Sequence, residues 1–215
     1  MIKLIAFDLD GTIGDTLPLC ITAFGDAVSP YLDHKLSEEE IVRHFGLSAE
    51  GMIKKVAGKH WQEALKDYYI LYRKLHVLCP EPFDGIKDWI TELRQQNIIV
   101  ALVTGKGERT CQITLEQFEM LDCFDSIATG SPDKNIKTEE LLSLKNRYGL
   151  PSNQIVYVGD AVSDIISCNQ ADVMCLSAGW AKSADIKQLE EYNKGYVFST
   201  IQSLKEYILQ FEASI

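Results

Sequence analysis

Four short runs of apolar residues recur along the chain, and they constrain its fold more than any other feature of the sequence. The runs are rich in β-branched side chains and occupy residues 2–7, 98–103, 155–158 and 173–176. None alternates apolar with polar residues, which is typical of strands buried on both faces of a parallel sheet. Amphipathic stretches separate the runs; Ile86, Trp89, Ile90 and Leu93, for example, share one face of a helix. This alternation predicts a doubly wound α/β domain with a parallel, Rossmann-like sheet.

One long stretch, residues 16–82, interrupts the alternation because it contains helical signals and no convincing strand pattern. Within it, Ser37 and Glu40 form a capping-box pattern, which indicates the start of a helix. The stretch is too short to bury a large core of its own. The sequence therefore predicts an α/β core built from residues 1–15 and 83–215, with a helical domain of residues 16–82 inserted after the first strand.

The charge of the chain argues against two classes of partner. The 215 residues include 31 acidic and 21 basic side chains, a net charge of −10. Surfaces that bind nucleic acids or anionic membranes concentrate positive charge, so we expect neither partner. The first apolar run reaches a charge at Asp8, too early for a signal peptide, and no later run nears the roughly 18 apolar residues of a membrane span. We therefore expect a soluble, cytoplasmic protein that is a monomer or a homodimer.

The six cysteines support neither a zinc site nor a disulfide framework. No two of them form a Cys-x-x-Cys pair, the commonest half of a structural zinc site. Cys79 and Cys175 stand among apolar neighbours, as small buried hydrophobic residues do. A chain of this length can bury a core without disulfides, so free cysteines are favoured over disulfide pairs.

Polar groups follow three of the predicted strands at the point where each ends. They are Asp8 and Asp10 after the first run, Thr104 and Gly105 after the second, and Asp160 and Asp164 after the third. Ligands of open α/β sheets bind at the carboxyl ends of the strands, so these groups should converge on one site. Asp8 and Asp10 are two residues apart, a spacing that points both side chains the same way in extended backbone.

Simpler explanations account for these residues one at a time but not together. Asp8, Asp10 and Gly11 resemble part of a calcium loop, yet Ile13 occupies the position where that loop requires glycine. Gly105 and the lysine after it resemble the end of a phosphate-binding P-loop, whose first glycine is missing. An isolated acid at a strand end is often only a turn former or a helix cap. Complementary groups at three strand ends favour a single functional site.

These motifs resemble those of the haloacid dehalogenase superfamily, and the resemblance covers nearly the whole chain. It rests on Asp8-Leu9-Asp10-Gly11-Thr12, on Thr104, on a lysine before the third strand end, and on Gly159-Asp160 with Asp164. The helical insertion is similar to the small cap of the phosphoglycolate-phosphatase-like branch. That resemblance implies an α-helical cap domain that covers the site.

Two lysines are candidates for the third motif. Many relatives carry this lysine in a Lys-Pro-x-Pro segment, which is absent here. In others it stands at the start of a helix, with an acid two residues later. Lys137, followed by Glu139, resembles this second form and is preferred; Lys134 is the alternative.

The resemblance implies a role for each site residue. Asp8 would attack phosphorus and form an aspartyl-phosphate, while Asp10 would protonate the leaving oxygen and later activate water. Mg²⁺ would be held by Asp8, the backbone carbonyl of Asp10, and Asp160, with Asp164 a ligand or a neighbour of the ligands. The phosphoryl oxygens would bind to the hydroxyl of Thr104, the backbone N–H of Gly105 and the ammonium of Lys137.

The implied function is a Mg²⁺-dependent phosphatase that hydrolyses a small phosphorylated metabolite. A phosphomutase on the same scaffold is the main alternative, and a non-catalytic phosphate-binding module is a further one. The second acid of the first motif, Asp10, argues against a dehalogenase or a phosphonatase. Basic residues of the insertion that could contact the substrate, although a solvated surface position is favoured for each, are Arg43, His44, Lys54, Lys55, Lys59 and His60.

Overall fold

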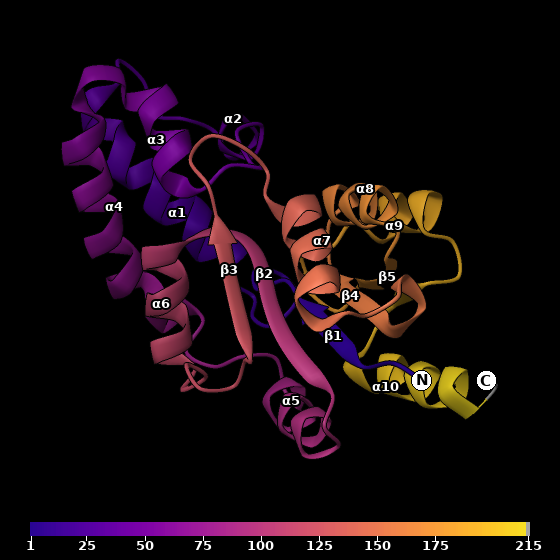
Figure 1. The fold of residues 1–215 in the computed structure, drawn as a ribbon. Coiled ribbons are helices and arrows are strands. Elements are labelled where there is room, and N and C mark those ends of the chain that lie inside the picture. Colours follow the sequence, from indigo (N-terminus) through magenta and orange to yellow (C-terminus); the bar gives the residue numbers. More distant parts are fainter. Residues whose placement is uncertain (214–215) are drawn as a thin grey trace.

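The protein is built on a parallel sheet of six strands, seen here in a computed structural model that describes residues 1–213 (Figure 1). The strands run in the order β3-β2-β1-β4-β5-β6 across the sheet. Their bounds are β1 (Leu4–Phe7), β2 (Ile99–Gly107), β3 (Ser126–Gly130), β4 (Ile155–Gly159), β5 (Met174–Ala178) and β6 (Val197–Phe198). This order, with β1 at the centre, is that of a doubly wound α/β fold, so the predicted fold class is confirmed.

Ten α-helices accompany the sheet in the described residues. Five lie between β1 and β2, and the first four of these belong to the insertion: α1 (Leu17–Val28), α2 (Glu38–Val42), α3 (Ala49–Ala57) and α4 (Trp61–Leu75). The other six are α5 (Ile86–Gln95), α6 (Glu108–Gln117), α7 (Lys137–Tyr148), α8 (Val162–Ala171), α9 (Ile186–Tyr192) and α10 (Ile201–Ala213).

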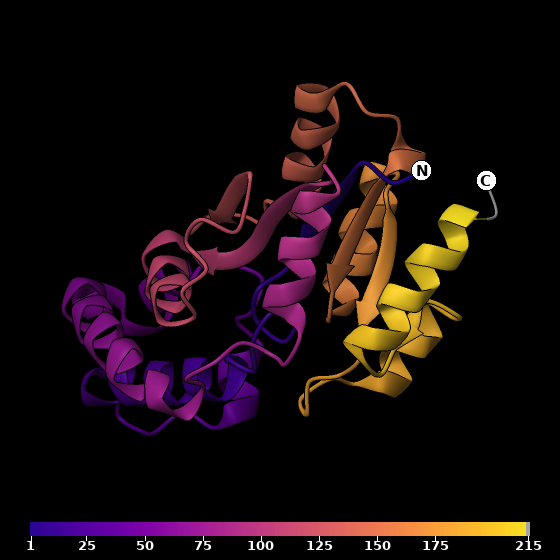
Figure 2. The ribbon, with the colours of Figure 1, turned by 90° about the horizontal axis from the view of Figure 1, so that it is seen from below.

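The central strand shows why the sheet is covered on both sides. All four residues of β1 are buried, and successive side chains enter opposite layers. Leu4 and Ala6 pack in one hydrophobic cluster with α7, α8 and α9, whereas Ile5 and Phe7 pack in a second cluster with α5 and α10. Figures 1 and 2 show these two groups of helices on opposite faces of the sheet. The apolar runs predicted a sheet buried on both faces, and helices do cover both faces of this sheet.

Two strands of the sheet, β3 and β6, are absent from the four predicted runs. β3 has the sequence Ser-Ile-Ala-Thr-Gly and is only partly buried, and β6 contains just two residues. Both lie at the edges of the sheet, where one side of the strand has no partner. Edge strands need less apolar sequence than central ones, and so they leave a weaker pattern.

The insertion, residues 16–82, forms a group of helices that lies beyond the carboxyl ends of β1 and β2 (Figure 1). We call this stretch the helical segment. It packs around α1 and α4, where Phe24 and Tyr68 meet edge to face with ring centroids 6.4 Å apart. Ser37 and Glu40 form the predicted capping box at the start of α2. Across residues 16–82, all of them described, the only β-pairing is an isolated bridge between Phe45 and Leu47.

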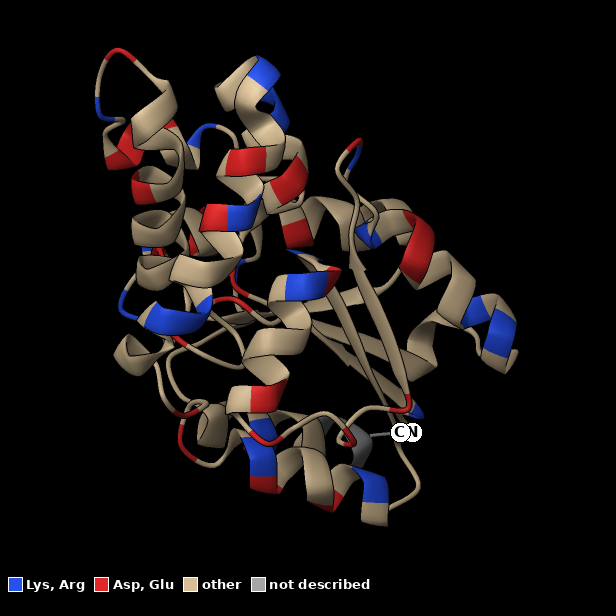
Figure 3. Cartoon of the chain, turned by 90° about the vertical axis from the view of Figure 1, so that its left-hand side faces the viewer, with Lys and Arg blue, Asp and Glu red and all other residues tan. Residues whose placement is uncertain are grey.

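The charged residues, the cysteines and the lengths of the helices can be compared with the expectations from the composition. Figure 3 shows Lys and Arg interspersed with Asp and Glu along the helices. All six cysteines are free. None of the helices in residues 1–213 combines the length and apolar composition that crossing a bilayer would require.

Candidate active site

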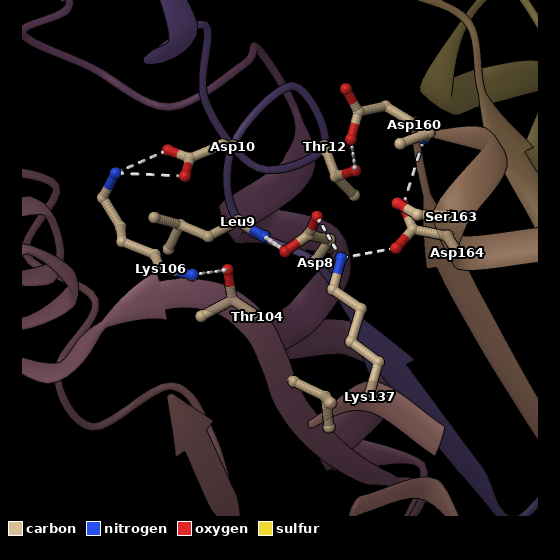
Figure 4. A network of polar contacts seen from close by, with 12 residues as sticks. Asp8, Leu9, Asp10, Thr12, Thr104, Lys106, Lys137, Asp160, Ser163 and Asp164 are labelled. Atoms are coloured by element: carbon tan, nitrogen blue, oxygen red, sulfur yellow. Dashed lines mark hydrogen bonds and ion pairs between the residues drawn. The ribbon is translucent and has the colours of Figure 1, made fainter. Parts of the chain in front are cut away.

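Asp8 follows β1 directly and stands at the centre of the candidate site (Figure 4). Its backbone N–H donates to the carbonyl of Val158 at 2.8 Å, which continues the pairing of β1 with β4. Its Oδ1 accepts from the backbone N–H of Leu9 at 2.7 Å, and its Oδ2 accepts from Nζ of Lys137 at 2.8 Å. Burial raises the pKa of Asp8 above its usual range, although the ammonium of Lys137 opposes this.

Asp160 follows the carboxyl end of β4 and Asp164 lies in the first turn of α8, and with Asp8 they form a cluster of three carboxylates. One oxygen from each lies within 4.8 Å of the others. Loss of hydration, followed by the negative charges of Asp8 and Asp164, raises the pKa of Asp160 well above its usual range. Gly11 makes room for this cluster: a Cβ there would lie 2.1 Å from Oδ2 of Asp160, and its φ is +76°. Three close carboxylates with oxygen ligands only are suited to a hard divalent cation.

Lys137, the first residue of α7, supplies the positive charge in this cluster. Its ammonium donates to Asp8 and also to Oδ1 of Asp164, whose other oxygen accepts from the backbone N–H of Ala161 at 3.1 Å. Burial by itself would lower the pKa of Lys137, but Asp164 and Asp8 outweigh it and raise that pKa. The alternative, Lys134, is exposed and pairs with Glu139 at 2.6 Å. The structure therefore brings Lys137, and not Lys134, to Asp8.

Thr104 and Gly105 lie at the carboxyl end of β2, next to β1 in the sheet. Both line the cavity that also contains Asp8 and Lys137. Thr104 is buried, and its hydroxyl oxygen accepts from the backbone N–H of Lys106 at 3.2 Å. All the residues predicted at the strand ends thus meet at one edge of the sheet.

The side chain of Asp10 faces away from the carboxylate cluster and pairs with Lys106, which is not among the predicted site residues (Figure 4). Nζ of Lys106 lies 2.7 Å and 3.1 Å from the two carboxylate oxygens of Asp10 (Figure 4). The same ammonium lies 3.2 Å from Sγ of Cys20 and 4.7 Å from the centroid of the Tyr72 ring. The hydroxyl of Thr16 also donates to Asp10. Burial would lower the pKa of Lys106, but Asp10 outweighs it and raises that pKa well above its usual range.

A signal for Lys106 exists in the sequence. It stands two residues after Thr104, and in a strand residues i and i+2 face the same side. The second apolar run ends before Thr104, whereas β2 continues to Gly107 and carries both side chains into the site.

A cavity of about 210 Å³ joins these groups to the helical segment. On the side of the α/β core it is lined by charged and polar groups, among them Asp8, Asp10, Lys106, Lys137 and Asp160. On the side of the helical segment it is lined mainly by apolar and aromatic side chains. The six basic residues that the sequence offered as substrate contacts are all absent from the lining in the described structure.

The comparisons with known proteins agree with this geometry. The sequence profile of haloacid dehalogenase-like hydrolases matches residues 5–178, most of the chain. The chain belongs to the haloacid dehalogenase-like hydrolase family. The predicted family and the predicted class of enzyme, a phosphatase-type hydrolase, are thereby confirmed.

Relatives of similar sequence are named for different phosphatase activities. A protein of Caldanaerobacter subterraneus subsp. tengcongensis that is named as a pyrophosphatase, PpaX, is 29% identical over 188 residues, which cover 84% of this chain and 83% of the relative. The phosphoglycolate phosphatase of Pseudomonas fluorescens is 28% identical over 194 residues, covering 83% of this chain and 70% of the relative. The crystal structure of a predicted phosphoglycolate phosphatase from Haemophilus somnus has a TM-score of 0.76 at 20% identity, covering 95% and 98% of the two chains, which supports the shared fold.

Proposed function

We propose that the protein is a Mg²⁺-dependent phosphatase that hydrolyses small phosphate monoesters through an aspartyl-phosphate on Asp8. The observation that carries this proposal is the environment of Asp8: a carboxylate at the end of the central strand, bonded to the ammonium of Lys137 and beside two further acids. Such a group can act as a nucleophile only toward a substrate whose negative charge is neutralised nearby.

In the first step, a carboxylate oxygen of Asp8 attacks phosphorus while the bond from phosphorus to the ester oxygen breaks. The backbone N–H of Leu9 fixes one oxygen of Asp8 and Lys137 binds the other, so the carboxylate is held in one orientation before the substrate enters. The hydroxyl of Thr104, the backbone N–H of Gly105 and the ammonium of Lys137 would bind the three phosphoryl oxygens as charge shifts between them.

Asp10 would transfer the protons. It lies in the cavity beside Asp8, and it would donate a proton to the departing alkoxide and then remove one from the water that hydrolyses the aspartyl-phosphate. Lys106 and the hydroxyl of Thr16 hold its carboxylate. These contacts hold the carboxylate facing away from Asp8 in this structure, so Asp10 would have to turn toward the ester oxygen before it transfers a proton.

The carboxylate cluster fits Mg²⁺. Asp8 and Asp160 would hold the ion together with the backbone carbonyl of Asp10, and Asp164 would act as a further ligand or orient Lys137. When bound, the ion supplies positive charge that neutralises the attacking carboxylate and the phosphoryl group. A donor set of carboxylates, with a single lysine shared by Asp8 and Asp164, leaves a net negative charge that a divalent cation would balance.

Replacement of Asp8 tests the proposal. Asp8→Asn removes the nucleophile at nearly constant volume, so phosphate release should fall by about 10³-fold or more. Asp84→Asn, an identical change at an exposed position, should leave the rate unchanged. Activity of Asp8→Asn equal to that of the wild type, or full activity of the wild type in EDTA, would contradict the proposal. Isomerised sugar phosphate in place of free phosphate would identify a phosphomutase.

A further inference from the structure

The two sides of the cavity differ in charge, and this difference bears on the substrate. In the described structure, none of the cavity-lining residues contributed by the helical segment has an ionisable acidic or basic group of the Asp, Glu, Lys, Arg or His type. Its main lining side chains are Leu17, Phe24, Phe45, Leu47, Met52 and Tyr68. Whatever part of a substrate extends from the phosphoryl site toward the helical segment therefore meets an apolar surface.

The basic residues of the helical segment are directed elsewhere. Nζ of Lys54 pairs with Glu50 at 2.7 Å and lies 4.5 Å from the centroid of the Trp61 ring. Arg43 is exposed and lies 4.0 Å from Glu39 on its own helical turn. Neither can neutralise an anion in the cavity from these positions.

The two lysines that do line the cavity are already committed to carboxylates. Lys137 binds Asp8 and Asp164, and its place in the proposed reaction is at the phosphoryl group. Lys106 binds both oxygens of Asp10, and its side chain is 3% exposed. A second anionic group on the substrate would have to compete with Asp10 for Lys106 or remain unpaired beside apolar side chains, and either is costly.

Phe45 marks the side of the cavity where an apolar group would bind. It is a large aromatic side chain that is 40% exposed, yet it lines the cavity. It lies in the short connection between α2 and α3, where it forms an isolated bridge with Leu47. An aromatic ring left partly in water at a cavity gains free energy when a ligand covers it.

Resting on the proposed phosphatase function, we propose that the preferred substrate is a phosphate monoester of a compact, uncharged and largely apolar alcohol. The apolar body of that alcohol would pack against Phe45, Leu47 and Met52, while the phosphate binds at Asp8 and Lys137. The cavity of about 210 Å³ would receive this body beside the phosphoryl site. Esters with a second anionic group, such as phosphoglycolate, would be poorer substrates.

Three primary alkyl phosphates test this inference, because their leaving groups are of the same chemical type. We expect kcat/KM of the wild type to be about tenfold or more higher for benzyl phosphate than for 2-phosphoglycolate, with ethyl phosphate between them. Absence of phosphate release from all three, with pyrophosphate also inert, would refute the phosphatase function itself. Phosphate release that is faster from 2-phosphoglycolate than from benzyl phosphate would refute the substrate class and leave the phosphatase function intact.

Two variants locate the preference in the helical segment. Phe45→Ala should reduce kcat/KM for benzyl phosphate by about tenfold and for ethyl phosphate by less, because only the ring loses its contact. Leu47→Lys should move the ratio of the two activities toward 2-phosphoglycolate, because it adds a cation to the lining. Val42→Ala and Val42→Lys are the matched controls, since Val42 is exposed in α2 and is outside the cavity lining. Equal changes in the Val42 and cavity variants, or an unchanged ratio in both cavity variants, would overturn the assignment.

Discussion

A single methyl group added at Gly51 should push the start of α3 away from the α/β core. Gly51 lies in the first turn of α3, and a Cβ there would be 2.1 Å from the carbonyl oxygen of Pro132 and 2.7 Å from its carbonyl carbon. Nearby, the backbone N–H of Ser48 donates to the carbonyl of Ser131 at 2.9 Å, and Ser48 is buried. These contacts join the start of α3 to the loop that follows β3.

The size of the effect follows from these distances. Ordinary contact begins near 3.4 Å, so the backbones at Gly51 and Pro132 must move apart by more than an ångström. No rotamer change can relieve the clash, because the opposing atoms are backbone. Met52 lines the cavity beside Gly51 and would move with it, and displacements of about 1 Å can cost catalysis up to about 10²-fold. We expect kcat/KM of Gly51→Ala to fall by about 10- to 100-fold.

Stability should change much less than activity. Alanine is favoured over glycine inside a helix by up to about 1 kcal/mol, which offsets the loss of about 1 kcal/mol from the hydrogen bond between Ser48 and Ser131. Initial rates of phosphate release and thermal melts, measured on the same samples, would separate the two effects. Gly25→Ala is the matched control, because its Cβ in α1 would meet only the flexible end of Ile41, at 3.3 Å. Wild-type kcat/KM in Gly51→Ala would refute the reasoning, as would an equal loss in both variants.

Three further predictions concern the charges of the site and a buried histidine. Lys137→Ala should lower kcat by about 10²-fold or more, because a cation at the phosphoryl oxygens is lost, whereas Lys134→Ala should change it little; steady-state kinetics that rank the two in reverse would place the third-motif lysine at Lys134. Mg²⁺ should raise the Tm of the wild type, by the equivalent of about 2.7 kcal/mol at 100 times its Kd, and a melt of Asp160→Asn that shifts equally would exclude Asp160 as a ligand. Burial lowers the pKa of His76 in the folded protein. Below about pH 6.5 the unfolded chain therefore binds a proton at this residue more readily than the folded protein does, and the free energy of unfolding should fall as the pH drops below that value. Melts over this range should show a weaker pH dependence in His76→Gln than in the control His34→Gln at an exposed site, and equal slopes would contradict the assignment.

The sequence predicts the centre of the fold better than its edges. Strands β1, β2, β4 and β5 are buried between two layers of helices, and that burial requires runs of apolar residues that are visible in the sequence. Strands β3 and β6 join the sheet by pairing with β2 and β5, through backbone hydrogen bonds that any residue except proline can make. Their sequences therefore contain little that distinguishes them from loops.

The candidate site divides in a similar way. Asp8, Thr104 and Asp160 could be predicted because each stands at the end of an apolar run, and a parallel sheet brings the carboxyl ends of its strands together. The pair formed by Lys106 and Asp10 joins residues 96 positions apart, and nothing in the spacing of either residue specifies the other. The part of the cavity lining that comes from the helical segment depends on how α1, α3 and α4 pack against one another. The helical spacing of apolar residues predicts that each helix has an apolar face, but it does not predict which faces meet.

The contrast between the two sides of the cavity also bears on how substrate enters. If the helical segment moves away from the sheet to admit a substrate, its lining becomes hydrated and must lose that water when it returns. An apolar lining releases water favourably, whereas charged side chains would lose their hydration at each return, at a cost of several kcal/mol per ion.

The charged groups of the cavity instead lie on the α/β core. The exceptions are Asp10, which accepts from Thr16, and Lys106, which pairs with Asp10 and lies against Cys20 and Tyr72. The acid proposed to transfer protons and its lysine partner therefore both contact the helical segment directly. Movement of that segment would therefore change the surroundings of Asp10 while leaving Asp8 and Lys137 in place, which couples proton transfer to the position of the helices.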